Sequence, residues 1–168
     1  AKRSIASITP RFNVARMVGE YAQKFYAPAA RQGRRYAADD FAPAREVAAW
    51  KARIRAAWPA VRLRRLDEPT RRMTFGNSVR IEIAVQLHGL APSDITVEAL
   101  FGRPDSEHYH ARARHYALSS IGSNDKGEQI FALDLTPEQC GKLEYRIRAY
   151  PAHPLLTHKF ELGLMAWL

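Results

Sequence analysis

The sequence contains a single cysteine, Cys140, so the chain holds no partner for an internal disulfide. A cysteine-based zinc site is excluded for the same reason, unless histidines supply most of the ligands. Cys140 lies in the turn-like stretch TPEQCGK, where we expect an incidental residue rather than a nucleophile. Together these features predict a protein of the reducing cytoplasm.

Long apolar runs are also missing. No stretch approaches the ~20 apolar residues of a transmembrane helix, and no continuous apolar segment follows Lys2 and Arg3 as it would in a signal peptide. We therefore expect no membrane partner. With 168 residues, 46% of them hydrophobic, the chain can form one ordinary domain, or a small domain with a helical appendage.

Acidic residues are scarce: 17 Asp and Glu face 26 Lys and Arg, which gives a formal charge of +9. Such a charge is typical of nucleic-acid-binding proteins. The arginines, however, concentrate in residues 31–72, and aromatic side chains do not alternate with them as a base-stacking surface requires. A solvated or domain-facing arginine surface is the favoured interpretation, and nucleic-acid binding is kept as the less favoured alternative.

Motifs of catalysis are absent. There is no G-x-S-x-G elbow and no glycine-rich phosphate loop after a strand. Glu107, His108, His110 and His115 are the only residues grouped as zinc ligands could be, and a solvated polar segment is the favoured interpretation. Candidate carboxylates fall in turns or at outward strand positions, and no glycosidase pair can be assigned among them: Asp105, Glu107, Asp125, Glu128 and Asp134.

Trp50 and Trp58 could stack on a sugar ring, but they share helical spacing with Val47 and Ile54. That spacing favours packing in a core or between domains. No catalytic, cofactor-binding or metal-binding residue is therefore predicted in this chain.

The first 60 residues have helical periodicity. Asn13 is a plausible N-cap, and Phe12 and Met17 are placed to form a hydrophobic staple. Pro28 should end or interrupt this helix, and a second helix should begin near Phe41–Pro43 and stop at Pro59.

From about Val61 the period changes to two, which is typical of half-buried strands. Strands are predicted in VRLRRL, VRIEIAVQLHG, ITVEALF, RHYALSSI, QIFALDL, LEYRIRAY and KFELGLMAW. The fold class is therefore α+β: helices over residues 1–60, followed by an immunoglobulin-like antiparallel β-sandwich over residues 61–168.

Two stretches resemble a known family. SIASITPRFNVARMVGEYAQKFYAPAA is similar to the closing helical segment of bacterial α-glucan (glycogen/maltodextrin) phosphorylases, in which Phe-x-x-x-Arg-Met-(Val/Leu)-x-(Glu/Asp)-Tyr precedes an aromatic pair and a proline. The matching residues are Phe12, Arg16, Met17, Val18, Glu20, Tyr21, Phe25, Tyr26 and Pro28. YRIRAYPAHPLLTHKFELGLMAW resembles the end of the short phosphorylase subfamily that carries an extra C-terminal β domain.

The resemblance implies that this chain is the tail of a longer enzyme. That enzyme would use phosphate to release glucose 1-phosphate from an α-1,4-glucan, with pyridoxal 5′-phosphate held by a lysine. None of the lysines here lies in the family's cofactor motif, and its catalytic histidine loop is absent, so no catalytic residue is carried over: Lys2, Lys24, Lys51, Lys126, Lys142 and Lys159.

The implied partner is the remainder of the phosphorylase chain, onto which Phe12, Arg16, Tyr21 and Tyr26 would dock. Contact with α-glucan and assembly into an oligomer are both open. The alternative function is a free-standing carbohydrate-binding module that stacks sugars on exposed aromatic rings: Tyr109, Tyr116, Tyr150 and Trp167.

Overall fold

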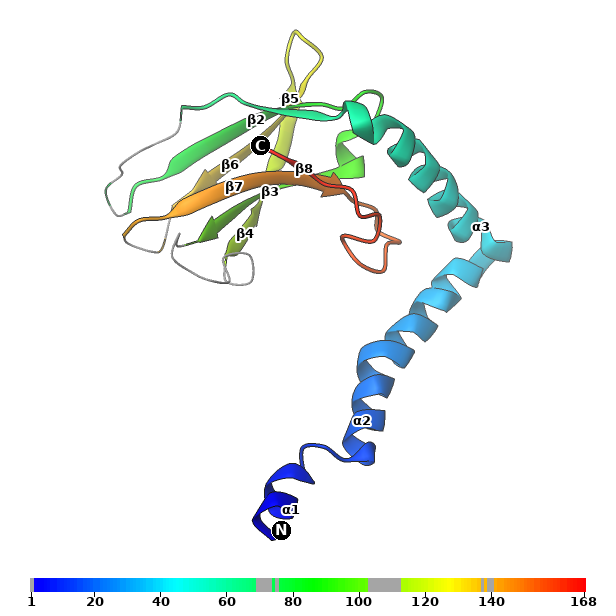
Figure 1. Ribbon diagram of the computed structural model, residues 1–168. Helices are drawn as coiled ribbons and strands as arrows, with labels where there is room; N and C mark the ends of the chain where they lie inside the picture. Colours follow the sequence, from blue (N-terminus) through cyan, green and yellow to red (C-terminus); the bar gives the residue numbers. More distant parts are fainter. Residues whose placement is uncertain (1, 69–73, 75, 103–112, 137, 139–140) are drawn as a thin grey trace. The chain divides into compact units, whose positions relative to one another are not determined.

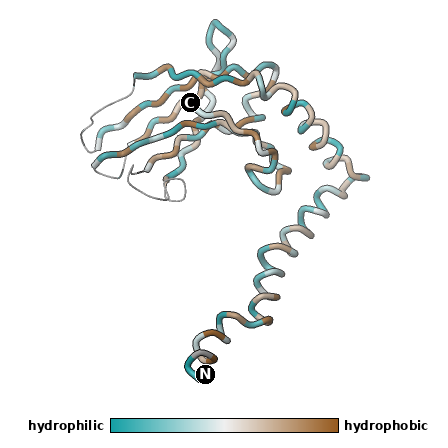
Figure 2. Tube along the Cα trace, viewed as in Figure 1, coloured by the Kyte–Doolittle hydropathy of each residue, from teal (hydrophilic) through white to brown (hydrophobic). Residues whose placement is uncertain are grey.

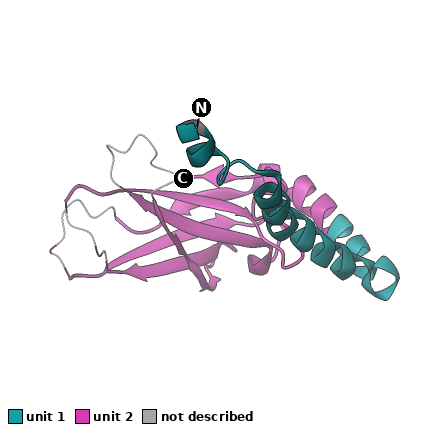
Figure 3. Cartoon of the chain, turned by 90° about the horizontal axis from the view of Figure 1, so that it is seen from below, with its two compact units in different colours: residues 1–49 teal, residues 50–168 magenta. Residues whose placement is uncertain are grey.

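The computed structural model describes residues 2–68, 74, 76–102, 113–136, 138 and 141–168. The chain divides into two compact units, residues 1–49 and residues 50–168, which Figure 3 colours separately. The first unit is helical. The second contains the last turns of the longest helix and every strand of the described residues (Figure 1).

Three helical elements precede the long helix: α1 (Lys2–Ile8), α2 (Val14–Tyr21) and the π-helical turn η1 (Ala22–Tyr26). Asn13 is the N-cap of α2, as predicted, because its side-chain oxygen accepts a 2.8 Å hydrogen bond from the backbone N–H of Arg16. Contact between Phe12 and Met17 stays a prediction. None of the described helices combines the length and the apolar character needed to cross a membrane.

Pro28 interrupts the regular helix without ending it. The π turn η1 lies directly before it, and the backbone N–H of Ala27 donates to the carbonyl of Ala22. A proline has no N–H, and its ring crowds the carbonyl four residues earlier. The wider π turn accommodates this proline, and α3 (Ala27–Ala57) continues the helix.

Within α3, residues 38–41 leave the helical conformation. Ala38 is extended (φ −59°, ψ 149°), and Asp39, Asp40 and Phe41 have positive φ angles of 47°, 51° and 61°. Left-handed conformations cost L-residues roughly 1–2 kcal/mol each. Helical angles resume after Phe41, which confirms the predicted start of a second helix near Phe41–Pro43.

Eight strands form two four-stranded antiparallel sheets within the described residues. One sheet has the order β1-β2-β6-β5 and the other β4-β3-β7-β8. The strands are β1 (Arg62–Arg65), β2 (Val79–Gln86), β3 (Ile95–Gly102), β4 (Arg114–Ala117), β5 (Ser119–Ser123), β6 (Gln129–Leu135), β7 (Glu144–Pro151) and β8 (Ala166–Trp167). Short 3-10 turns precede β1 and β3: η2 (Trp58–Ala60) and η3 (Pro92–Asp94).

The core of the second unit lies between the two sheets. Alternate residues of the strands point into it, among them Ile81, Ile83 and Val85 of β2 and Val97 and Ala99 of β3. The last turns of α3 add Trp50, Ile54 and Trp58 to the same core. The second unit is thus a helix end packed on a two-layer β-sandwich.

The segment RHYALSSI does not form the single strand that was predicted. It forms β4 in one sheet and β5 in the other, with buried Leu118 between them. A register irregularity between Ser120 and Gly122 follows. Alternating polarity marks extended backbone but does not identify the sheet in which the backbone pairs, and for this reason the sheet change was missed.

The predicted strand KFELGLMAW is also wrong over most of its length, since only Ala166–Trp167 pairs as β8. Before it, the backbone N–H of Glu161 donates to His158 O (3.0 Å) and that of Gly163 to Phe160 O (3.0 Å), which makes turns. Gly163 has a φ of +67°, a conformation that interrupts a strand. Leu162 and Leu164 of this segment do pack on the core, but from turn and loop backbone.

Candidate functional site

The densest polar group of the described residues lies on sheet β4-β3-β7-β8, on the face turned away from the core. Val97, Ala99, Ile147 and Ala149 point inward, so their neighbours point to the opposite face. The register places Glu98 of β3 directly opposite Arg148 of β7, although 50 residues separate them in sequence.

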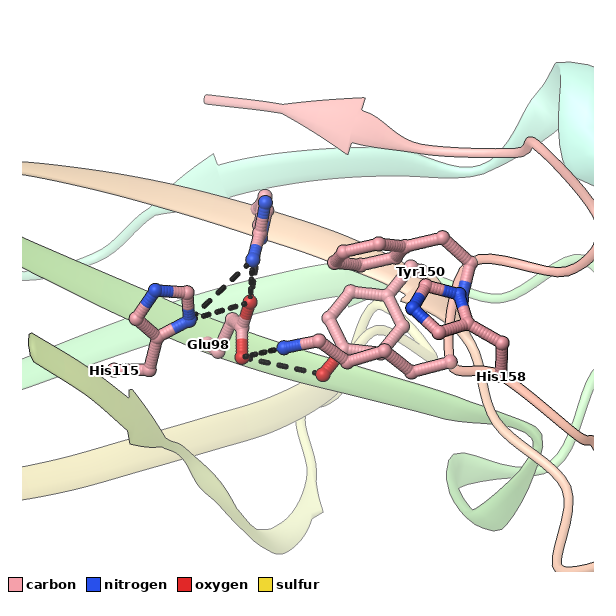
Figure 4. A network of polar contacts seen from close by, with 7 residues as sticks. Glu98, His115, Tyr150 and His158 are labelled. Carbon is pink, nitrogen blue, oxygen red and sulfur yellow. Dashed lines mark hydrogen bonds and ion pairs between the residues drawn. The ribbon is translucent and has the colours of Figure 1, made fainter. Parts of the chain in front are cut away.

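Four groups surround the Glu98 carboxylate (Figure 4). Arg148 Nε donates to its Oε1 at 2.5 Å, and Tyr150 Oη donates to its Oε2 at 3.2 Å. His115 Nδ1 lies 3.4 Å from Oε1, and Lys159 Nζ lies 3.9 Å from Oε2. We call these five residues the Glu98 cluster. The side chains of Glu98 and Arg148 are only 6% and 8% exposed, so the pair is shielded from water.

Aromatic rings enclose the Arg148 guanidinium. Its central carbon lies 4.8 Å from the centre of the Phe160 ring, 5.5 Å from that of Trp167 and 5.7 Å from that of Tyr150. Trp167 lies opposite Arg148 in the β7–β8 register. Cation–π contacts strengthen when the cation is desolvated. Through Phe160 and Trp167, Arg148 therefore holds the C-terminal segment on the outer face of the sheet.

The chemistry of the cluster is that of a structural ion pair. Burial, together with the neighbouring Glu98 charge, raises the pKa of Tyr150 to about 12, so this phenol stays a hydrogen-bond donor well into the alkaline range. Both oxygens of Glu98 have hydrogen-bond partners. A general base must reach a substrate proton, whereas the Glu98 side chain is shielded from solvent by its partners, which favours a structural role.

A second polar group connects the end of α3 to the sandwich. Asp94 accepts hydrogen bonds from Trp50 Nε1 (2.8 Å), from both terminal nitrogens of Arg53 (2.8 and 3.1 Å) and from the backbone N–H of Ala91 (2.8 Å). Burial by itself would raise the pKa of Asp94. The bonds from Arg53, Ala91 and Trp50 outweigh it and lower that pKa below its ordinary value.

Three of the four candidate zinc ligands lie outside the described residues: Glu107, His108 and His110. The candidate carboxylate Asp105 lies outside them as well. His115 is described and belongs to the Glu98 cluster. In the described ranges, no group of three or more His, Cys, Asp or Glu side chains could hold a metal ion.

The remaining candidate carboxylates that have partners in the fold bind arginines. Glu128 is buried and accepts from Arg64 (2.5 Å) and Asn124 (2.7 Å), and its pKa is lowered chiefly by Arg64. Asp134 accepts from Arg80 at 2.8 Å on the exposed outer side of β2 and β6. Among the described residues between 53 and 80, four of the six arginines are paired with carboxylates: Arg53, Arg64, Arg65 and Arg80.

The aromatic candidates do not form a sugar platform in the described part of the chain. Tyr116 is half-buried and meets Phe101 edge to face, with 5.7 Å between ring centres, and Tyr150 is buried. Tyr109 lies outside the described residues, and Trp167 is 46% exposed. Trp50 and Trp58 are buried in the core, as their helical spacing predicted.

Sequence reasoning missed both polar clusters. A charged residue in an otherwise apolar strand, such as Glu98 in ITVEALF, is a signal for a buried ion pair. Its partner cannot be found in the same way, because the pairing depends on strand register across the sheet.

Comparison with known proteins gives consistent matches. The family model described as "Glycogen phosphorylase C-terminal domain" matches residues 58–168. The chain is 32% identical over 166 residues to a glycogen phosphorylase of Mycobacterium bovis, covering 98% of this chain and 19% of that protein. It is 36% identical over 176 residues to a maltodextrin phosphorylase of Thermococcus litoralis, covering 99% and 20%. The chain thus spans about a fifth of the length of these relatives.

Proposed function

Because this chain belongs to the family of glycogen phosphorylase C-terminal domains, we propose that it is the C-terminal part of an α-1,4-glucan phosphorylase and has no catalytic activity by itself. The parent enzyme would act in the cytoplasm, releasing glucose 1-phosphate from glycogen or maltodextrin. Within it, residues 1–60 would complete the catalytic half, and residues 61–168 would form the appended domain.

Pyridoxal 5′-phosphate would bind elsewhere in the parent. A Schiff-base lysine needs an enclosed site, yet five of the six lysines here are exposed. The sixth, Lys51, is half-buried and ion-paired with Glu161. The lysines of this chain therefore do not fit the cofactor, and no reaction step is assigned to them.

The helical unit carries the observation on which the proposal depends. Its large apolar side chains are 45–75% exposed from α1 to η1: Ile5, Ile8, Phe12, Val14, Met17, Val18, Tyr21, Phe25 and Tyr26. We call these residues the apolar arm, and Figure 2 shows apolar positions recurring along it. Large exposed apolar surfaces mark interaction sites.

The occupant of the apolar arm is the preceding part of the parent chain. The family model begins at residue 58, whereas the relatives match 98–99% of this chain. Residues 1–57 therefore align with sequence that comes before the C-terminal domain in those phosphorylases. This placement supports a role for the arm in closing the catalytic half.

The sandwich acts as a rigid scaffold in this proposal. Arg148 of the Glu98 cluster holds the C-terminal segment through Phe160 and Trp167, and Asp94 fixes the end of α3. Lettering β1 to β8 as A, B, C, C′, D, E, F and G turns the two sheet orders into A-B-E-D and C′-C-F-G. That order supports an immunoglobulin-like arrangement.

The test combines this chain with the preceding part of its parent, produced separately, and measures glucose 1-phosphate release from maltoheptaose and phosphate. We expect no release from the 168-residue chain alone and binding between the two parts. A Met17→Asp/Phe25→Asp chain should bind the preceding part at least tenfold more weakly, and an Arg34→Asp chain should bind normally. Turnover by this chain alone, or unchanged binding by the double variant, would contradict the proposal.

A parallel titration of this chain with glycogen and maltoheptaose tests whether the sandwich contacts glucan. Binding that is lost in Trp167→Ala would assign a glucan-contacting role to the sandwich. Binding to polynucleotides with a steep salt dependence would favour the nucleic-acid alternative. Indifference to all of these ligands would leave the scaffold role.

A further inference from the structure

Residues 38–43 of α3 could adopt a broken or a continuous helix, and each of these two forms carries a backbone penalty that the other lacks. In the broken form, Asp39, Asp40 and Phe41 are three consecutive left-handed residues, and none of them is glycine. In a continuous helix these three would be relaxed, but Pro43 would then lie in the helix interior. There it would lack an N–H, and its ring would clash with the carbonyl of Asp39.

The contacts of these residues do little to hold the broken form. The ion pair of Asp40 with Arg45 spans 3.9 Å, and the two side chains are 93% and 64% exposed. Exposed pairs of this kind contribute little. Phe41 is 55% exposed, so its burial does not offset a left-handed backbone.

Pro43, in contrast, favours the broken form. When helical angles resume after Phe41, the proline falls in the first turn of the new helix, where its missing N–H has no partner to lose. The free-energy cost of a proline inside a helix is of the same order as the summed cost of a few left-handed residues. Because the two penalties oppose each other and are similar in size, the broken and continuous forms lie close in free energy.

We propose that residues 38–41 are a two-state hinge that interconverts between this left-handed break and a continuous helix through Pro43. The inference does not depend on the proposed function. A contact that prefers one state then selects it at small cost, because shifting two nearly balanced states needs only a modest difference in affinity. The sequence ADDFAP is thus a switchable joint between two helical segments.

The test measures distances across the hinge in the 168-residue chain. Cys140→Ser removes the only native cysteine, and Arg34→Cys and Arg55→Cys, both at exposed positions, receive spin labels. A continuous helix would separate these positions by about 32 Å, from 21 residues at about 1.5 Å each. Pulsed electron–electron double resonance then gives the distribution of distances between the two labels. The population near this distance is the continuous form, and the population away from it is the broken form.

We expect Pro43→Ala to raise the ratio of continuous to broken form by roughly 100-fold, because it removes the interior-proline penalty. Asp40→Gly should lower that ratio by about tenfold, since glycine adopts left-handed angles freely and is a poor helix former. Pro28→Ala, a proline removed from the same helix but away from the hinge, should leave the distribution unchanged.

The fluorescence of the buried tryptophans, Trp50 and Trp58, confirms that each variant retains the folded second unit. The hinge is supported if Pro43→Ala and Asp40→Gly move the distribution in opposite directions. It is overturned if both variants match the parent sequence, or if Pro28→Ala shifts the distribution as much as Pro43→Ala does. The docking experiment on the apolar arm has a different readout, so either idea can fail without the other.

Discussion

Replacing Asp94 by alanine should destabilise the second unit by about 3 kcal/mol, the sum of three losses. The Trp50 N–H would stay buried without an acceptor, which costs about 1–3 kcal/mol. The Ala91 N–H would lose a partner worth about 1 kcal/mol. Arg53 is half exposed and can turn to water, so its pair contributes at most about 1 kcal/mol.

The assay is urea unfolding of the 168-residue chain, followed by the fluorescence of the buried tryptophans. Single domains are stable by only about 5–15 kcal/mol, so a loss of about 3 kcal/mol should displace the midpoint clearly. Asp94→Asn is the matched control, since its amide oxygen can still accept from Trp50. It should keep the share that passes through Trp50 and lose the shares of Ala91 and Arg53, so it should cost less than Asp94→Ala.

The pH dependence gives an independent check. The pKa of Asp94 is lower in the folded state than in the unfolded chain, because its donors favour the charged form. The unfolded state therefore takes up a proton first as the pH falls. The stabilisation is complete well above the ordinary Asp pKa of about 3.9 and is lost as the pH falls below it.

The Asp94→Ala protein should lack this part of the acid sensitivity. A loss below about 1 kcal/mol in Asp94→Ala, or an acid profile identical to that of the parent sequence, would refute the view that Asp94 fastens the end of α3 to the sandwich. A double-mutant cycle with Trp50→Phe measures the share that passes through the indole N–H.

Three further predictions concern the outer face of sheet β4-β3-β7-β8 and the loop beside it. Glu98→Ala should cost about 3–5 kcal/mol in urea unfolding, because it leaves Arg148 buried without its carboxylate; a cost below about 1 kcal/mol would contradict this. In a spectrophotometric titration, one tyrosine should ionise near pH 12. Glu98→Gln should lower that midpoint without restoring the ordinary value, since the burial of Tyr150 remains. An unchanged midpoint would show that Glu98 does not contribute to the raised pKa of Tyr150. Lys51→Ala should cost no more than about 1 kcal/mol, because its pair with Glu161 is partly solvated, and a larger loss would show that this surface pair does more than its exposure suggests.

Part of the helical unit could be predicted because its signals are local. The cap at Asn13 and the helix restart after Phe41 both depend on residues within one turn. The π turn before Pro28 and the three left-handed residues could not be predicted from periodicity. A proline reports that the regular helix is disturbed, but several backbone geometries satisfy the same constraint.

The candidate site was less accessible from sequence than the fold. Asp94 stands in a turn in the sequence and gives no sign that Trp50 and Arg53, more than 40 residues earlier, will donate to it. Tyr150 was a candidate sugar-stacking ring, yet it is buried beside Phe160 with 5.1 Å between ring centres. Exposure depends on what covers a residue, and the covering segment here is a loop.

The sequence by itself determined the family, the order of helices before strands, and the stretches that form β2, β3, β6 and β7, because periodicity and motif order are properties of neighbouring residues. Only the tertiary structure decided that residues 114–123 divide between two sheets and that residues 157–165 turn instead of pairing. It also decided that Glu98 meets Arg148. Each of these outcomes depends on which distant strand lies alongside, and that choice is made by packing the whole core rather than by any local stretch of chain.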